Sequence, residues 1–271
     1  MSFTFKKIAA AGALIGAIAL AGCDQQAKDP NHIKVGVIVG AEQQVAETAV
    51  KVAKDKYNLD VELVTFNDYV LPNEALSKGD IDVNAFQHKP YLDQQIKDRG
   101  YKLVSVGNTF VYPIAGYSKK IKSLTELQDG AQIAIPNDPT NLGRSLLLLQ
   151  KAGLIKLKEG VGLLPTSLDI VENPKNLKIV ELEAPQLPRS LDDQQIALAV
   201  INTTYASQIG LTPAKDGIFV EDKDSPYVNL LVSREDNKDA ENVKKFVEAY
   251  QSDEVAESAN KIFNGGAVKG W

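Results

Sequence analysis

Short apolar segments alternate with amphipathic ones along most of this chain, and this alternation constrains its fold more than any other feature. The β-branched run over 33–39 is typical of a buried strand, and an amphipathic helical stretch over 42–57 follows it. The same reasoning predicts strands over 61–66 and 81–86 and helices over 73–77 and 90–99. Strands that alternate with helices in this way predict parallel strands and an α/β fold.

The alternation resumes after a long extended segment over 101–117, which is long enough to leave one lobe and enter another. Beyond it we expect strands over 132–136, 177–183 and 196–201, with a helix over 141–151. The apolar run over 227–233 can return the chain to the first lobe, before two amphipathic helices over 239–250 and 253–263. Periodicity therefore predicts two α/β lobes, although it does not fix the number of connections between them.

An uncharged apolar segment that ends at the only cysteine precedes these elements. Lys6 and Lys7 are followed by the apolar run 8–20 and then by Ala21-Gly22-Cys23, the layout of a secretory signal over residues 1–22. The run is shorter than the ~20 residues that span a bilayer. The small residues before Cys23 match the bacterial lipobox, which predicts a lipidated Cys23 at the start of a tether over 23–32. The alternative is an ordinary secreted protein with a cysteine near its cleavage site by chance.

The residue after the cysteine predicts a location. Asp24 resembles the signal that retains Gram-negative lipoproteins in the inner membrane, so we expect an anchor there with the protein facing the periplasm. The alternative is that Asp24 merely opens a polar tether.

The composition is that of a soluble globular protein, with 44% hydrophobic and 24% charged residues. Because Cys23 is the only cysteine, no internal disulfide can form, and stability must come from burial. The net charge of -5 becomes more negative once a signal with two lysines and no acid is removed, and no basic patch interleaved with aromatic residues occurs. These features argue against a nucleic-acid partner.

Aromatic side chains gather at the ends of two predicted strands and in the loops after them. They are Phe66, Tyr69, Phe86 and Tyr91, and His88 lies among them. Ligands of open α/β sheets bind beyond the carboxyl ends of strands, so this placement predicts an aromatic-lined slot. The alternative, that these residues are simply core, is strongest for Phe66. No Cys, Asp or Glu cluster with ligand spacing accompanies His88, so we expect no metal site.

Arg144 is predicted one turn into the helix that follows the strand over 132–136, where Asp138, Thr140 or Asn141 could cap the helix. A guanidinium near a helix N-terminus forms a bidentate receptor for a carboxylate. The alternative is a surface arginine paired with a neighbouring acid.

Two asparagines interrupt or follow apolar strands. Asn202 follows the run over 197–201, and Asn229 lies between Val228 and Leu230. Asparagine is depleted in strand interiors, and its amide offers both a donor and an acceptor, so we expect polar recognition at these two positions. No acidic residue stands out as a partner for a ligand ammonium group, and we therefore expect amide and backbone oxygens to accept its hydrogen bonds. The alternative is an asparagine at a strand end or turn.

Catalytic motifs are missing from the sequence. It contains no Gly-x-Ser-x-Gly elbow, no phosphate-binding P-loop and no His-Glu-x-x-His motif, and a lipidated Cys23 cannot act as a nucleophile. We therefore expect neither an enzyme nor a cofactor.

Several segments resemble those of the NlpA type of methionine-binding lipoproteins. They are the run 79–92 (GDIDVNAFQHKPYL), the segment 136–144 (PNDPTNLGR), Val35-Gly36-Val37, Asn229 and the ending over 263–267. The resemblance covers essentially the whole chain after the predicted signal.

The resemblance implies the fold and the boundaries of its parts. It implies a two-lobed type II periplasmic binding protein with a ligand cleft between lobe I (33–113 plus 229–271) and lobe II (114–228). The implied ligand is methionine, and the implied site residues are Phe66, Tyr69, Phe86, His88, Tyr91, Asn141, Arg144, Asn202 and Asn229.

The implied partners are the permease and ATPase of an ABC importer, and we expect the free protein to be a monomer. Alternatives are a binder of another amino acid or of a methionine-containing dipeptide, a periplasmic enzyme, and a structural lipoprotein.

Overall fold

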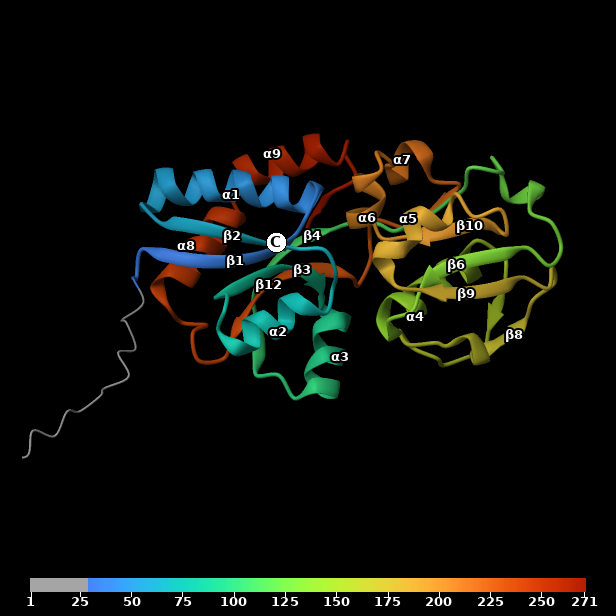
Figure 1. Ribbon diagram of the computed structural model, residues 1–271, viewed down its shortest axis with the longest axis horizontal. Coiled ribbons are helices and arrows are strands. Elements are labelled where there is room, and N and C mark those ends of the chain that lie inside the picture. Colours follow the sequence, from blue (N-terminus) through green and yellow to red (C-terminus); the bar gives the residue numbers. More distant parts are fainter. Residues whose placement is uncertain (1–28) are drawn as a thin grey trace, which may run out of the picture.

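The structure, a computed structural model, describes residues 29–271. Two α/β lobes lie side by side along the long axis of the molecule (Figure 1). The predicted signal peptide, Cys23 and Asp24 lie outside the described residues. No helix within residues 29–271 is long and apolar enough to cross a bilayer.

The first lobe is built on a six-stranded mixed sheet with the order β13-β4-β12-β3-β1-β2. Its strands are β1 (His32–Ile38), β2 (Asp60–Phe66), β3 (Val83–His88), β4 (Leu103–Val111), β12 (Val228–Arg234) and β13 (Val268–Lys269). β1 pairs in parallel with both β2 and β3, whereas β12 runs antiparallel between β3 and β4. The carboxyl ends of β1, β2 and β3 therefore meet at one edge of the sheet.

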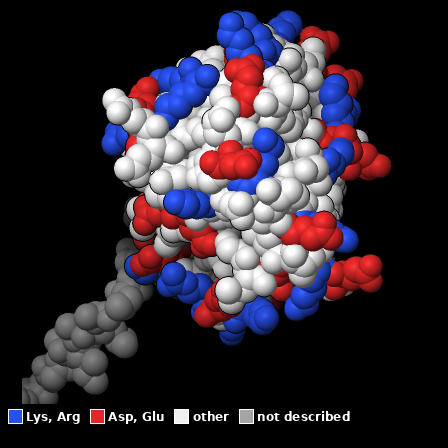
Figure 2. All heavy atoms as spheres, turned by 90° about the vertical axis from the view of Figure 1, so that its right-hand side faces the viewer, with Lys and Arg blue, Asp and Glu red and all other residues white. Residues whose placement is uncertain are grey.

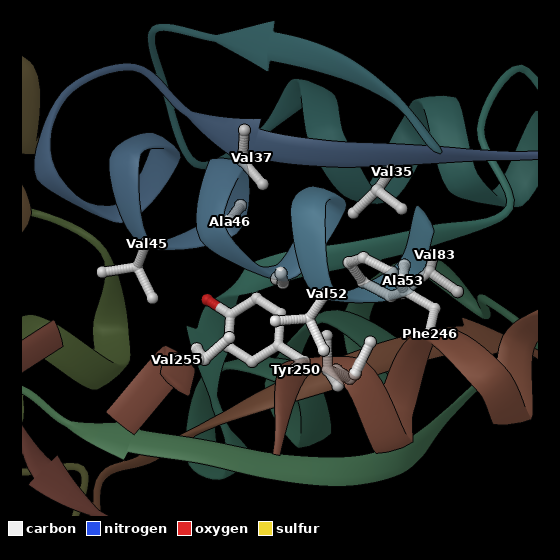
Figure 3. Packing of buried hydrophobic residues seen from close by; sticks show 14 of the residues in the cluster. Val35, Val37, Val45, Ala46, Val52, Ala53, Val83, Phe246, Tyr250 and Val255 are labelled. Atoms are coloured by element: carbon white, nitrogen blue, oxygen red, sulfur yellow. The ribbon is translucent and has the colours of Figure 1, made fainter. Parts of the chain in front are cut away.

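Helices cover both faces of this sheet (Figure 1). They are α1 (Ala41–Tyr57), α2 (Leu71–Lys78), α3 (Lys89–Arg99), α8 (Glu241–Tyr250) and α9 (Asp253–Ile262). Figure 3 shows Val35 and Val37 of β1 facing α1, with Phe246 and Tyr250 of α8 beside α1 on the same face of the sheet. Val35 and Val37 are fully buried, as the apolar runs of a sheet covered on both faces should be.

The second lobe contains a five-stranded sheet with the order β11-β5-β10-β6-β9. Its strands are β5 (Ala115–Tyr117), β6 (Gln132–Pro136), β9 (Lys178–Leu182), β10 (Ile196–Ile201) and β11 (Phe219–Val220). Its helices are α4 (Pro139–Lys151), α5 (Leu187–Ser190), α6 (Thr203–Gln208) and α7 (Pro213–Asp216). In addition, β7 (Lys156–Leu157) pairs antiparallel with β8 (Ile170–Glu172) in a separate two-stranded sheet. Acidic and basic side chains alternate over the face of this lobe in Figure 2, so its surface charge is mixed in sign.

The chain crosses between the lobes twice. β4 ends at Val111 in the first sheet and β5 begins at Ala115 in the second, and the return runs from Val220 of β11 to Val228 of β12. The extended segment over 101–117 and the apolar run over 227–233 provide these crossings, in the roles that the sequence indicates. The lobe boundaries at 113/114 and 228/229 stay predictions at the level of single residues.

Two expectations about the strands need correction. The prediction of parallel strands is right for β1, β2 and β3 and for β6, β9 and β10, but β4, β5, β11, β12 and β13 pair antiparallel. β5 and β12 enter their sheets from the other lobe, which reverses their direction, whereas β4 and β11 pair antiparallel because each lies beside one of these two strands. The strand predicted over 81–86 instead spans Val83–His88, because His88 pairs with Asn229 of β12 and so extends the ladder.

Candidate ligand-binding site

A cavity lies between the lobes, lined by side chains of both. Eight of the nine predicted site residues line it, namely Tyr69, Phe86, His88, Tyr91, Asn141, Arg144, Asn202 and Asn229. Its lining also includes Gln87, Tyr112, Thr203 and Thr204. The structure thus brings side chains from both sheets, far apart in sequence, around one enclosed space.

Phe66 is the predicted residue that the cavity lining lacks. It ends β2 and is half-buried against hydrophobic clusters of the first lobe and the lobe boundary. This position agrees with the alternative that Phe66 is a core residue, and we leave it out of the proposed site.

One side of the cavity is aromatic. The Tyr69 ring centroid lies 5.8 Å from that of Phe86 and 6.1 Å from that of Tyr91, and the rings of Phe86 and Tyr91 are 6.0 Å apart. The Tyr91 hydroxyl donates to the carbonyl oxygen of Tyr69 at 2.8 Å, which fixes this loop against α3. The result is an apolar wall at the carboxyl ends of β2 and β3, where the sequence predicts it.

His88 joins the aromatic wall to the other lobe. Its Nδ1 accepts a hydrogen bond from the Tyr91 backbone N–H at 3.1 Å and so caps α3. Nε2 must then carry the proton, and it donates to Oδ1 of Asn141 at 3.2 Å. Burial, and then the charge of Arg144, lower the pKa of His88 to about 3, so the ring is neutral. Among residues 29–271, no three His, Cys, Asp or Glu side chains form a group that could hold a metal ion.

Arg144 is buried, with 4% of its surface exposed, on the α4 helix whose N-terminus is capped by Asp138. Its Nε and Nη2 donate to the two carboxylate oxygens of Glu221 at 2.9 and 2.5 Å, and Nη2 also donates to the carbonyl oxygen of Tyr112 at 3.0 Å. Its guanidinium carbon lies 4.4 Å from the ring centroid of Tyr227. Among the described residues, only Nη1 of this guanidinium has no hydrogen-bond partner.

The surroundings of Arg144 modify both interpretations that the sequence allows. Arg144 does pair with an acid, but the pair is buried and joins α4 to the segment after β11, 77 residues away. The free part of the guanidinium is one nitrogen rather than a whole bidentate edge, because Glu221 holds the other edge. A ligand carboxylate can therefore reach Arg144 end-on, through Nη1.

The side-chain amides of Asn141, Asn202 and Asn229 form the polar wall of the cavity. Asn141 Oδ1 accepts from Asn202 Nδ2 at 2.9 Å, and Asn229 Nδ2 donates to the carbonyl oxygen of Phe86 at 3.1 Å. Within the described structure, Asn202 Oδ1 and the Tyr112 hydroxyl are buried without any hydrogen-bond partner. Buried polar atoms are almost always satisfied, so an unpaired acceptor in a cavity wall marks a place where a ligand donor fits.

Two acids near the cavity are not predicted by the sequence analysis. Glu221 follows the short strand β11 and holds Arg144, and nothing in the local sequence distinguishes it from the other loop acids. Glu42 lies in the first turn of α1, is only 3% exposed and accepts a hydrogen bond from the Thr204 hydroxyl. The signal for Glu42 was its place just beyond the carboxyl end of β1, at the same sheet edge as the aromatic residues.

The lobes touch directly around the cavity. Besides the bond from His88 to Asn141, Gln208 Nε2 donates to the carbonyl oxygen of Val39 at 2.9 Å, and the Tyr205 hydroxyl donates to the carbonyl oxygen of Asn67 at 3.3 Å. The bonds of Gln208 and Tyr205 connect α6 of the second lobe with loops of the first, as in a closed cleft.

A cavity enclosed between two α/β lobes that two crossings connect defines a bilobal ligand-binding protein of the type II periplasmic class. The chain belongs to the NlpA lipoprotein family, whose model matches residues 33–271.

Curated relatives and solved structures agree with this membership. The chain is 89% identical to the D-methionine-binding lipoprotein MetQ of Salmonella typhimurium and 88% identical to that of Escherichia coli K12, over the full length of all three. A crystal structure of the methionine binding protein MetQ superposes with a TM-score of 0.89 at 91% identity, covering 90% of this chain and 99% of that one. A nutrient binding protein from Burkholderia cenocepacia bound to methionine gives a TM-score of 0.85 at 54% identity, covering 88% of this chain and all of that one.

Proposed function

We propose that this chain is a lipid-anchored substrate-binding protein that captures methionine between its lobes and delivers it to an ABC transporter. The observation that carries the proposal is the division of one cavity into an aromatic wall and a polar wall with a buried cation and an unpaired acceptor. The relatives include D-methionine-binding lipoproteins and a protein bound to methionine, which supports methionine as the ligand.

The polar wall suits the zwitterionic head of an amino acid. Arg144 would bind the α-carboxylate through Nη1, held in place by Glu221. The free Oδ1 of Asn202 would accept a hydrogen bond from the ammonium group, and Asn229 and Asn141 complete this wall. An unpaired buried acceptor costs ~1–3 kcal/mol, so a ligand that satisfies it gains that much over one that cannot.

The aromatic wall suits the thioether tail. Each sulfur–aromatic contact contributes ~0.3–1.5 kcal/mol, and Tyr69, Phe86 and Tyr91 form one continuous surface on which a sulfur atom can contact more than one ring. The neutral His88 ring packs at the edge of the same wall, 6.2 Å from the Tyr91 ring centroid. A straight hydrocarbon tail of equal length would lack these contacts.

The role of a substrate-binding protein also accounts for the lipid anchor and for the transporter as a partner. A lipidated Cys23 followed by Asp24 would keep the protein on the periplasmic side of the inner membrane, beside the permease that receives the ligand. The ATPase of the transporter would consume the ATP, and this chain would act as a monomeric carrier without catalysing a reaction.

Native purification followed by mass spectrometry tests the ligand directly. We expect methionine to be released on denaturation, and calorimetry of the stripped protein to show tight binding of L- and D-methionine. Norleucine, which replaces the sulfur by a methylene, should bind more weakly. The absence of bound methionine together with no heat of binding would overturn the proposal, and a stronger response to a methionine-containing dipeptide would reassign the ligand.

A further inference from the structure

A buried carboxylate without a cation lies beside the proposed head-group wall. Glu42, in the first turn of α1, accepts a hydrogen bond from the hydroxyl of Thr204 in the other lobe. Its Oε2 also lies 3.5 Å from Nδ2 of Asn229. Thr204 and Asn229 both line the cavity, whereas Glu42 lies directly behind them. Among the described residues, Glu42 forms no ion pair.

The groups around Glu42 offer no positive charge. The titratable side chains that interact with it are Tyr69 from the loop before α2, Tyr112 from the first crossing, Tyr205 from α6 and Tyr250 from α8. Burial raises the pKa of each of these tyrosines, so all four stay neutral. The charge of Arg144 is already matched by Glu221, and His88 is neutral.

A buried carboxylate is costly unless a positive charge or several hydrogen bonds compensate it. Two bonds, one of them long, are weak compensation for a side chain that is 3% exposed. The cavity wall in front of Glu42 is also where the free acceptor Asn202 Oδ1 indicates a ligand donor. A cation bound at this wall would satisfy both the unpaired oxygen and the uncompensated acid.

We propose that Glu42 is the charge-compensating and positioning residue of the ammonium subsite, acting on the ligand through Asn229 and Thr204. This inference rests on the proposed function, because it requires an amino-acid ligand. It replaces the expectation that amide and backbone oxygens alone recognise the ammonium group. Glu42 also links recognition to closure, since its bond to Thr204 exists only when the lobes meet.

The subsite then exchanges a proton with solvent when the ligand binds. With the lobes together, burial raises the pKa of the Glu42 carboxyl from its ordinary value to about 7, so below pH 7 a closed cleft without ligand holds mostly the neutral acid. A neighbouring ammonium group favours the carboxylate and lowers that pKa, so binding releases the proton to solvent. Acid therefore opposes binding.

Calorimetry on the wild-type protein measures the number of protons that are released when the ligand binds. We expect titrations with L-methionine at pH 6, in two buffers of different ionisation enthalpy, to show release of a proton, up to about 0.9 per ligand. The affinity should be weaker at pH 5.5 than at pH 7.5, by up to roughly 20-fold. Tight methionine binding without proton release and without this pH dependence would overturn the inference while leaving the proposed function intact. Failure to bind methionine at any pH would instead overturn the proposed function.

Glu42→Gln separates charge from structure, because it keeps the size of the side chain and removes the titrating group. The variant should bind methionine about tenfold or more weakly at pH 7.5 and should release no proton. Glu47→Gln, on the exposed side of the same helix, is the matched control and should behave as the wild type.

A ligand without an amine completes the test. 4-(Methylthio)butanoate keeps the carboxylate and the thioether, and its affinity should be the same for the wild type and for Glu42→Gln. Equal weakening of both ligands by the substitution would show that Glu42 has only a structural role. Proton release that persists in Glu42→Gln would assign the linkage to another group.

Discussion

At the scale of single residues, the cavity depends on charges that are buried and held in fixed pairs. Arg144 has the sequence context of an ordinary helix arginine, yet its guanidinium is fixed by Glu221, by the carbonyl oxygen of Tyr112 and by the ring of Tyr227. Because these contacts take up most of its donors, the remaining nitrogen has a defined direction. Pre-organisation of this kind lowers the entropic cost of binding a carboxylate.

Removal of the Arg144 guanidinium should weaken methionine binding severely. We expect Arg144→Ala to cost about 2–5 kcal/mol of binding free energy, because the ligand carboxylate loses its charged partner and Glu221 is left uncompensated. Calorimetry with L-methionine measures the loss, and Arg189→Ala, on the exposed side of α5, is the control. Unchanged affinity in Arg144→Ala, with a folded protein by circular dichroism, would move the carboxylate subsite elsewhere.

His88 should make the folded protein sensitive to acid. Its pKa falls from the ordinary value of 6.5 to about 3 on folding, so between these values the unfolded chain binds more protons than the folded one. The stability contributed by the neutral ring is therefore present above pH 6.5 and is lost as the pH falls toward 3, by up to about 1.4 kcal/mol per pH unit.

Urea denaturation of wild-type protein and His88→Asn at pH 6.5 and 4.5 isolates this effect. In the variant the asparagine can still cap α3 but no longer titrates, so its free energy of unfolding should fall less on acidification than that of the wild type. A parallel decline in the two proteins would contradict a neutral, buried His88.

At the scale of elements, the core of the first lobe is formed where α1 and α8 pack side by side on the sheet and α9 packs against α1. Val45, Val52 and Ala53 of α1 contact the same cluster as Phe246 of α8 and Val255 of α9 (Figure 3). The C-terminal helices thus complete a core that the N-terminal elements begin. Their burial also keeps β12, the strand that carries Asn229, in the middle of the first sheet.

Phe246→Ala tests how strongly this helix contact stabilises the fold. The side chain is fully buried, and truncation of such a phenylalanine removes about 3–5 kcal/mol of stability through lost burial and a residual cavity. Chemical denaturation measures the change, and Lys244→Ala on the exposed side of α8 should stay within about 0.5 kcal/mol of the wild type. A loss below 1 kcal/mol in Phe246→Ala would mean that α8 contributes little to the core.

Sequence periodicity predicts most of these elements because each strand or helix buries one face in a regular pattern. It predicts α1, α8 and α9 within about two residues. It cannot predict which strands run antiparallel, because the direction of β12 depends on the lobe from which the chain returns. The end of β3 also depends on pairing with β12, so Gln87 and His88 belong to a strand rather than to a loop.

The residues of the candidate site also differ in how far the sequence predicts them. Aromatic residues and asparagines stand out because their type is unusual at strand ends, and eight of the nine predicted residues line the cavity. Glu42 and Glu221 do not stand out, because an acid in the first turn of a helix or in a loop is ordinary in sequence. Only the tertiary structure places Glu42 beside Thr204 and Glu221 beside Arg144.

At the scale of the whole molecule, function depends on how the two lobes meet. The crossings after β4 and β11 are the only covalent links between the sheets in the described residues, so relative movement of the lobes requires rotation at these segments. A ligand that contacts both walls stabilises the closed arrangement by its differential affinity for it. Contacts between the lobes outside the cavity should therefore influence affinity without touching the ligand.

Gln208 provides the test of this coupling, because it contacts the other lobe but not the cavity. Its Nε2 donates to the carbonyl oxygen of Val39 at 2.9 Å, and a typical hydrogen bond contributes ~0.5–1.5 kcal/mol. Because this bond forms only between touching lobes, Gln208→Ala should shift the population toward the open form and weaken methionine binding by about two- to tenfold. Calorimetry measures the affinity, and small-angle X-ray scattering should show a larger radius of gyration for the variant at subsaturating ligand.

Lys215→Ala, an exposed position on α7 of the same lobe, is the control and should leave both measurements unchanged. If Gln208→Ala binds methionine as the wild type does, contacts outside the cavity do not set the closed population. Closure would then depend on the ligand and on cavity residues that connect the lobes, such as His88, which is hydrogen-bonded to Asn141. If the affinity falls while the scattering stays constant, the weakening reflects a local change in the closed form instead of a shift toward the open one.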